Sequence, residues 1–197
     1  VAYLQKIFFP QKDQANVAPL KNDFRPSLPY LFSDDLRLLT TSFALIMASG
    51  GSPIINFGEE VGKIDAGMPS YKTDFPWGGK LVAPGAGLKQ DKWVLGEYKK
   101  LISLRKSRPK IFVGAVSTIS GKFPEKTFCF ELVETGEVNS LSCFNYSGSS
   151  QTFTVSLPES WKEMSAVKDH FNGKNIKVEN GSITLSAQGY GASIVAP

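Results

Sequence analysis

Two adjacent carboxylates, Glu59 and Glu60, follow an apolar run over residues 53–57 and could act as an acid and base pair. A general acid and a general base must both face the bond that reacts. Neighbouring residues of a strand point to opposite faces, so these two cannot easily flank one bond. We therefore predict that they anchor the following loop instead of catalysing a reaction.

The chain contains one histidine, His170, which excludes a multi-histidine metal site and a serine–histidine relay elsewhere. We expect His170 to cap a turn, and we predict no metal site and no cofactor. Cys129 and Cys143 are too few for a disulfide scaffold, and both lie in apolar, strand-like runs. Buried free thiols are the favoured interpretation, and a cross-strand disulfide is the alternative.

A helix is predicted over residues 35–49. Ser33 is the expected N-cap, and Asp34 and Asp35 bring negative charge to the first turn. Apolar residues recur at three- and four-residue spacing, as on one face of a helix. This stripe consists of Leu36, Leu39, Phe43 and Ile46.

The next elements follow in a characteristic order. Residues 53–57 predict a short strand buried on both faces, as in a parallel sheet. Residues 59–92 lack periodicity and predict a long loop. Residues 94–107 show a second helical pattern, which Pro109 ends. This order indicates an α-β-α unit of an α/β fold within residues 1–109.

Residues 110–197 read as a separate, independently folded all-β domain, an antiparallel sandwich. Asn172-Gly173 and Asn180-Gly181 are typical hairpin turns. Four phenylalanines at strand spacing are expected in the core: Phe128, Phe130, Phe144 and Phe153. The candidate strands are 111–119, 127–133, 140–146, 152–157, 166–169, 175–178, 182–185 and 192–195.

Charge and hydropathy exclude two classes of partner. The 22 basic and 18 acidic residues leave a net charge of +4, and the dense basic cluster in residues 99–110 reads as a solvated helix face. We therefore predict no nucleic-acid partner. No apolar run approaches the ~18 residues of a membrane span, so no membrane partner is predicted. The chain opens without the pattern of a secretory signal, and cytoplasm, periplasm and secretion all remain alternatives.

The run Gly50–Gly62 resembles the eighth-strand segment of the alpha-amylase family, glycoside hydrolase family thirteen. That family has a Gly-x-Pro-x-Ile-x-Tyr-Gly-x-Glu-x-Gly pattern there. Further pieces with family-like motifs follow in the family's order. They are helix seven at 35–49, the Pro-x-Trp loop at 74–77, helix eight with its Leu-Ile-x-Leu-Arg core at 95–109, and β-domain turns at 169–173 and 188–191.

The resemblance implies the architecture and the chemistry. Residues 1–109 would be the C-terminal remnant of a (β/α)8 barrel, about its last two βα units, and residues 110–197 its C-terminal antiparallel β-sandwich. Family members cleave alpha-glucans with retention, using a nucleophile and a general acid on the fourth and fifth barrel strands. No Arg-x-Asp nucleophile segment occurs in this chain. The resemblance thus implies the C-terminal part of an amylase-type protein without its catalytic pair.

Three polar residues resemble the end of the family's seventh strand, which reads Asn-His-Asp with an Arg shortly after. Asn22 and Asp23 would match the Asn and Asp, Arg25 would match the Arg, and the His is missing. Asp23 would be the third catalytic carboxylate, stabilising a cationic transition state, and Asn22 and Arg25 would bind substrate. The alternative is a polar loop ahead of Pro26.

Aromatic residues of the long loop are further candidates. Trp77 is the expected substrate-binding residue, and Tyr71 and Trp93 could stack on sugar rings in the same way. Packing of these rings against the barrel is the equally favoured alternative.

Three functions fit these observations. The first is the C-terminal part of an alpha-glucan hydrolase or transglycosidase, the second a non-catalytic binding or interaction module, and the third an amylase-like protein that has lost activity. The predicted partners are an alpha-glucan or maltooligosaccharide, through the complete protein, and either the missing N-terminal barrel portion or a second copy of the chain.

Overall fold

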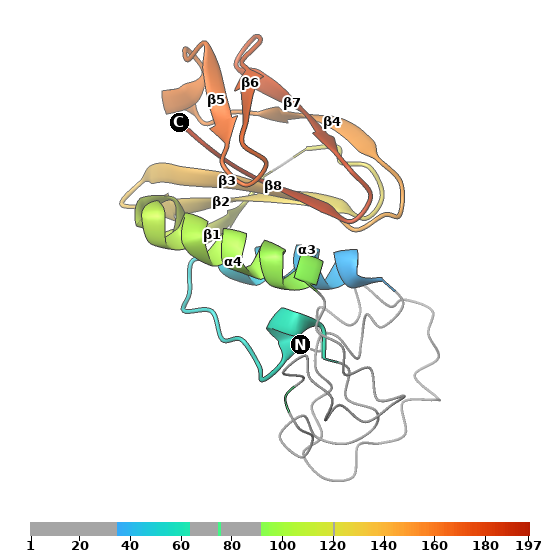
Figure 1. The fold of residues 1–197 in the computed structure, drawn as a ribbon. Helices are drawn as coiled ribbons and strands as arrows, with labels where there is room; N and C mark the ends of the chain where they lie inside the picture. The colour runs from blue at the N-terminus through green and yellow to red at the C-terminus, as the bar shows by residue number, and fades with distance from the viewer. Residues whose placement is uncertain (1–34, 64–74, 76–91, 120) are drawn as a thin grey trace, which may run out of the picture.

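The computed structural model describes residues 35–63, 75, 92–119 and 121–197. Two helices, α3 (Leu36–Ala48) and α4 (Lys92–Ser107), lie against one side of a six-stranded sheet, and a two-stranded sheet lies on the other side (Figure 1). Neither of these helices combines the length and the apolar character that a membrane crossing requires. The described part of the chain is a β-rich unit with two covering helices.

Helix α3 begins later than predicted, because Asp35 supplies its N-cap. The Asp35 backbone is extended, and its carboxylate accepts the Arg37 N–H at 2.9 Å. The Arg37 guanidinium lies 2.6 Å from the same carboxylate, and this hydrogen bond lowers the pKa of Asp35. The prediction of Asp35 in the first turn was therefore wrong, and Ser33 lies outside the described residues.

The two helices pack through one aromatic pair. The rings of Phe43 and Tyr98 stack with centroids 3.7 Å apart and planes 3° apart. Both side chains are fully buried, together with Leu39 and Leu101 on the same faces. Of the predicted stripe, Leu39 and Phe43 thus lie in the core and Leu36 packs against it, whereas Ile46 is not part of it. Trp93 lies in the first turn of α4 and not in the long loop, so its predicted placement was wrong.

The segment between α3 and η1 (Glu59–Val61) is not the predicted buried strand. Residues 52–56 carry no strand or helix assignment, and no strand of the described part pairs with them. Ile54 is 79% exposed and Phe57 is 48% exposed. A strand requires a hydrogen-bonded neighbour, and this run has none among the described residues. The apolar composition therefore marks a surface in this structure and not a core.

Eight antiparallel strands follow η3 (Pro109–Phe112), which takes up the start of the first predicted strand. All eight predicted strands are confirmed, β5 with its predicted bounds and the other seven with shifted ends. The six-stranded sheet has the order β1-β2-β3-β8-β5-β6, and β4 pairs with β7. The strands are β1 Ala115–Thr118, β2 Thr127–Glu134, β3 Glu137–Asn145, β4 Gln151–Ser156, β5 Ala166–Asp169, β6 Lys174–Lys177, β7 Ser182–Ala187 and β8 Gly191–Ala196, with η4 (Glu159–Trp161) after β4.

The predicted turns are confirmed. Asn180 and Gly181 have φ angles of 50° and 68°, and Glu179 and Ser182 exchange backbone hydrogen bonds of 2.9 and 3.0 Å across them. Two consecutive positive φ angles define a type I′ turn, which favours Asn-Gly. The β5–β6 turn contains Asn172-Gly173, with Gly173 at a φ angle of 71°.

One continuous core joins the helices and both sheets. Phe130, Phe144 and Phe153 are buried, and Phe128 packs against them with its ring 5.3 Å from that of Phe144, as predicted. The same cluster contains the buried side chains of α3 and α4. The division into a barrel segment, 1–109, and a β domain, 110–197, stays a prediction.

The cysteines form a disulfide, and the favoured prediction of free thiols was wrong. Cys129 in β2 and Cys143 in β3 are directly opposite in register, with Cα atoms 4.1 Å apart. Opposite residues of an antiparallel pair come this close only at positions without mutual hydrogen bonds. The strand pairing itself therefore places the two thiols side by side.

We expect reduction of this disulfide to lower the free energy of unfolding. The bond closes a loop with a sequence separation of 14, and removing such a constraint costs about 2 to 4 kcal/mol. Urea unfolding with and without dithiothreitol measures the effect. A Cys129→Ala, Cys143→Ala variant is the control, because its midpoint should not respond to dithiothreitol. An equal midpoint for the wild type in both buffers would contradict the prediction.

Candidate functional site

The residues that the sequence analysis placed in a substrate site lie outside the described part of the chain. These are Asn22, Asp23, Arg25 and Trp77, together with Tyr71. Their roles stay predictions. The structure does describe the turn after the predicted eighth strand, residues 56–63, which contains the carboxylate pair. We treat this turn and the apolar residues before it as the candidate site.

Glu59 closes the turn, as predicted. Its carboxylate accepts the Asn56 N–H at 3.2 Å and the Asn56 side-chain N–H at 3.1 Å. The Glu59 side chain is buried, and a buried carboxylate with these partners is fixed in one orientation. Glu59 and Glu60 belong to the 3-10 helix η1 and not to a strand end. Glu59 therefore anchors this loop through its hydrogen bonds with Asn56.

Two glycines shape the same turn. Gly58 has a φ angle of 86°, and a Cβ atom there would lie 2.6 Å from the Lys63 side chain. Gly62, at the end of η1, has a φ angle of 67°. Lys63 is buried, and its N–H donates to the Gly58 carbonyl at 2.9 Å. The Lys63 ammonium lies 4.6 Å from the centroid of the Phe57 ring. The turn is therefore compact, and Phe57 is held at its surface.

The buried hydroxyl of Tyr98 lies beneath this turn. Burial, and then the negative charges of Glu59 and Glu60, raise the pKa of Tyr98. The hydroxyl therefore stays protonated at any physiological pH. Tyr98 links the turn to the core but is not poised to act as a base.

Arg105 fixes the start of the apolar segment. Its guanidinium donates to the carbonyl oxygens of Met47 and Gly51 and lies 5.3 Å from the Phe112 ring centroid. Partial burial lowers the pKa of Arg105. Cations near the last carbonyls of a helix satisfy them and favour the helix dipole. Arg105 is therefore a structural clamp and not part of a solvated basic face, which corrects that part of the prediction.

His170 lies in the turn after β5, and capping of that turn by its side chain stays a prediction. It follows β5, and its backbone N–H donates to the Ile194 carbonyl at 2.8 Å. Burial, and then the positive charge of Arg108, lower the pKa of His170. Within the described ranges, no three His, Cys, Asp or Glu side chains gather as metal ligands would.

Asp169 begins the predicted turn at 169–173, and the role of its buried carboxylate in fixing that turn was not predicted. Asp169 is only 3% exposed and accepts the N–H groups of Phe171 at 3.1 Å and Asn172 at 3.0 Å. The Asn172 side chain donates to it at 2.7 Å, and the Ile194 N–H at 3.3 Å. An Asp that binds the backbone two residues ahead makes an Asx turn, so its position before a turn was the available signal.

Solved structures with the same fold include alpha-amylases, a cyclomaltodextrinase and a debranching enzyme. A protein of Thermus thermophilus aligns with a TM-score of 0.67 and 19% identity over 86% of this chain and 33% of that chain. A cyclomaltodextrinase aligns with a TM-score of 0.63 and 16% identity, covering 82% of this chain and 26% of its own. An alpha-amylase from Geobacillus thermoleovorans, complexed with acarbose, aligns with a TM-score of 0.61 and 13% identity over 83% of this chain and 34% of that chain.

The fold is that of part of these enzymes. At these identities the likeness shows the fold alone, and no protein-family model matches the sequence. The chain spans between a quarter and about a third of the length of the three structures. Glycosidase chemistry for this chain is therefore a matter of proposal.

Proposed function

We propose that this chain is the C-terminal part of an alpha-amylase-like glycoside hydrolase that acts on alpha-glucans. Helix α3, the segment 51–63 and helix α4 would supply the end of a (β/α)8 barrel. The two sheets would form its C-terminal β domain. The observation that carries this proposal is the alignment of more than four fifths of the chain with about a third of alpha-amylase structures.

The surface of the segment 51–63 supports the proposal. Ile55 and Phe57 are exposed and stand at the Ile and Tyr positions of the family's eighth-strand pattern, and Ile54 between Pro53 and Ile55 is also exposed. An eighth barrel strand is flanked by the first and seventh strands, so such residues would be buried in a complete barrel. The apolar surface then has a defined occupant, the N-terminal part of the same barrel.

The test of this proposal is the coding sequence upstream of Val1. We expect an Arg-x-Asp nucleophile segment and a strand-end Glu there, at the positions of a fourth and a fifth barrel strand. These residues would supply the acid and nucleophile pair of a retaining glycosidase. An upstream sequence without either carboxylate would contradict a hydrolase and favour the non-catalytic binding module.

We expect the chain by itself to show no turnover of maltoheptaose or a nitrophenyl maltoside. A carboxylate pair that flanks the scissile bond is required, and the turn carboxylate Glu59 is committed to Asn56. Release of nitrophenol measures this. A rate within a hundredfold of about 10 s⁻¹, surviving Asp23→Asn, would contradict the prediction.

A further inference from the structure

A groove runs along the side of the molecule between the helices and the sheets, away from the turn at 56–63. Its volume is about 650 Å³, and its walls come from the starts of α3 and α4, the β5–β6 turn, β6, β7 and the β7–β8 turn. We call it the lateral groove. Representative lining residues are Arg37, Trp93, Asn172, Thr184, Ser186 and Tyr190.

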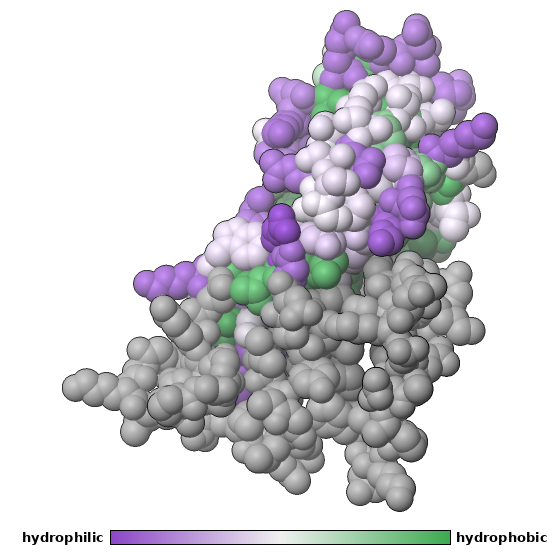
Figure 2. All heavy atoms as spheres, turned by 90° about the vertical axis from the view of Figure 1, so that its right-hand side faces the viewer, coloured by the Kyte–Doolittle hydropathy of each residue, from purple (hydrophilic) through white to green (hydrophobic). Residues whose placement is uncertain are grey.

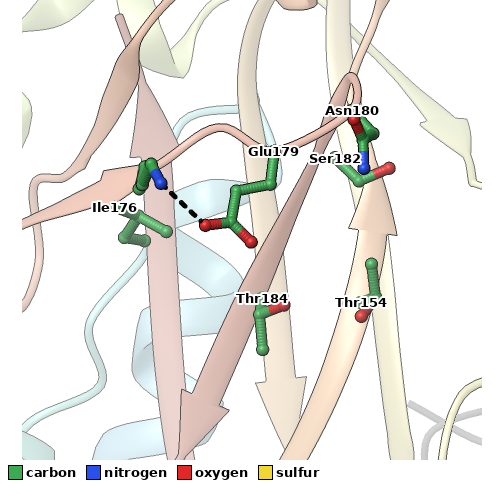
Figure 3. Close-up of a pocket in the computed structure, with 7 residues that line it drawn as sticks. Thr154, Ile176, Glu179, Asn180, Ser182 and Thr184 are labelled. Atoms are coloured by element: carbon green, nitrogen blue, oxygen red, sulfur yellow. Dashed lines mark ion pairs between the residues drawn. The ribbon is translucent and has the colours of Figure 1, made fainter.

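A second hollow, of about 340 Å³, continues the lateral groove. It lies between β6 and the outer face of the β4–β7 sheet, and its lining includes Thr154, Ser182 and Thr184 (Figure 3). The two hollows share Ile176, Lys177 and Thr184. Together they form a long open trough, the shape that suits an extended chain and not a compact ligand.

Buried hydrogen bonds hold the walls of the groove in place. Asp169 fixes the β5–β6 turn and ties it to β8 through the Ile194 N–H. The Asn145 side-chain amide donates to the carbonyls of Ser149 at 2.8 Å and Gln188 at 2.9 Å, so it joins the β3–β4 and β7–β8 turns. Groups held in this way cost little conformational entropy when a ligand binds.

Glycine packing keeps the β7–β8 turn in one position. A Cβ atom at Gly189 would lie 2.3 Å from the Gly148 carbonyl oxygen. On the wall beside it, the Tyr190 ring lies under the Arg37 guanidinium, at 5.1 Å, and its carbonyl accepts the Thr41 hydroxyl at 2.5 Å. The groove is therefore preformed between α3 and β8.

The chemistry of the trough is that of hydroxyl groups. Thr184 and Ser186 are exposed on β7, and Thr184 is paired in register with Thr154, which is also exposed. A hydroxyl can donate and accept a hydrogen bond, so a row of them matches a ligand that itself carries hydroxyls. Figure 2 views the side of the molecule where β4 and β7 lie, and the described surface there is mostly neutral to hydrophilic (Figure 2).

Aromatic side chains complete this lining. Trp93 is 48% exposed at the α4 end of the groove, and Tyr190, from the β7–β8 turn, is a second aromatic lining residue. An amphipathic ring presents an apolar face and accepts the C–H face of a sugar, while its edge stays hydrated. The combination of a ring with convergent hydroxyl and amide groups is typical of a polar-ligand site.

The charges of the trough argue against an anionic ligand. The cations that line it, Arg37, Lys174 and Lys177, are matched in number by the acidic residues Glu97, Asp169 and Glu179. Lys177 is paired with Glu179 at 3.0 Å, and Arg37 with Asp35 at 2.6 Å. A site for phosphates needs cations that are available to the ligand in a stripe. A neutral chain is therefore the ligand class that fits.

We propose that the lateral groove binds a linear, neutral oligosaccharide. The identification of that chain as an alpha-glucan rests on the proposed function.

Isothermal titration of the full chain with maltoheptaose, and separately with cellohexaose, tests the proposal. We expect weak binding of maltoheptaose, with a Kd near the millimolar range. In Thr184→Tyr and in Ser186→Tyr the affinity for maltoheptaose should fall by about tenfold or more. Both substitutions fill the groove from exposed strand positions. Thr118→Tyr is the matched control, because Thr118 is exposed on β1, the far edge of the six-stranded sheet.

The outcomes separate the groove from the proposed function. No binding of either sugar, or equal binding by Thr184→Tyr, Ser186→Tyr and Thr118→Tyr, would overturn the groove as a site. Binding of cellohexaose alone, lost in Thr184→Tyr, would support an oligosaccharide groove but overturn its assignment to alpha-glucans. Thermal midpoints of the variants within a few degrees of the wild type confirm that each one is folded.

Discussion

Replacing Asp169 by alanine is expected to lower the free energy of unfolding by about 3 to 5 kcal/mol. The Asp169 carboxylate accepts four N–H groups, and two of their residues, Phe171 and Ile194, are buried. Each buried donor that loses its acceptor costs about 1 to 3 kcal/mol. Asn172 is exposed, so water can replace its lost partner at a smaller cost.

Lys168→Ala is the control for Asp169→Ala. Lys168 precedes Asp169 on the same strand and is exposed, so its removal should change stability by no more than about 0.5 kcal/mol. Urea unfolding of both variants, followed by far-ultraviolet circular dichroism, gives the comparison. Asp169→Asn keeps one acceptor oxygen and should lie between the two. If Asp169→Ala were as stable as Lys168→Ala, the hydrogen bonds to its carboxylate would not support the fold.

The contacts of Asp169 also show which parts of this fold could be predicted from the sequence. Alternating patterns and Asn-Gly turns predicted all eight strands, because side-chain period and turn chemistry are local properties. The order of the strands and the packing of α3 and α4 on the sheet depend on contacts distant in sequence, and no local pattern predicts them. Asp169 illustrates the limit, since its contact with Ile194 spans 25 residues.

Two wrong predictions have the same physical origin. The run 53–57 has strand composition, but composition does not supply a neighbouring strand. Cys129 and Cys143 are hydrophobic enough to be buried as thiols, and only their register in the β2–β3 pair places them opposite each other. In both cases the outcome is decided by a partner segment, which sequence patterns within one segment do not reveal.

The candidate site was harder to predict from the sequence than the fold. The carboxylate pair Glu59 and Glu60 was predicted to anchor the loop, and the contacts with Asn56 confirm this role for Glu59. The lateral groove, in contrast, is assembled from several separate elements. Its hydroxyl residues look like ordinary exposed strand residues, and their common location follows only from the pairing of β4 with β7.

The exposed apolar segment leads to the last prediction, self-association of the chain at micromolar concentration. Ile54 is 79% exposed, Phe57 is 48% exposed, and the backbone between them has no strand partner in the described part of the chain. Unpaired extended backbone invites pairing with another chain. Burying each large apolar side chain contributes about 1.5 to 3 kcal/mol. Ile54, Ile55 and Phe57 on each copy can therefore hold a dimer together.

Sedimentation velocity with Ile54→Glu tests this surface directly. We expect the wild type to sediment as a dimer or larger species, and Ile54→Glu to sediment as a monomer, because a buried unpaired charge opposes the contact. Ser52→Glu is the matched control: it adds the same charge to the same exposed segment without removing an apolar side chain. A monomeric wild type, or equal behaviour of both variants, would contradict the prediction.

The two predicted partners of this segment are mutually exclusive. If an N-terminal barrel portion covers Ile54 and Phe57 in a longer protein, the same side chains are not available to a second copy. The longer protein should then sediment as a monomer under conditions in which the present chain does not. Ile54→Glu would in that case destabilise the longer protein, because the charge would enter its core. One substitution would therefore dissociate the short chain and unfold the long one, and this opposite pair of effects would indicate that the surface is an unfilled part of a barrel.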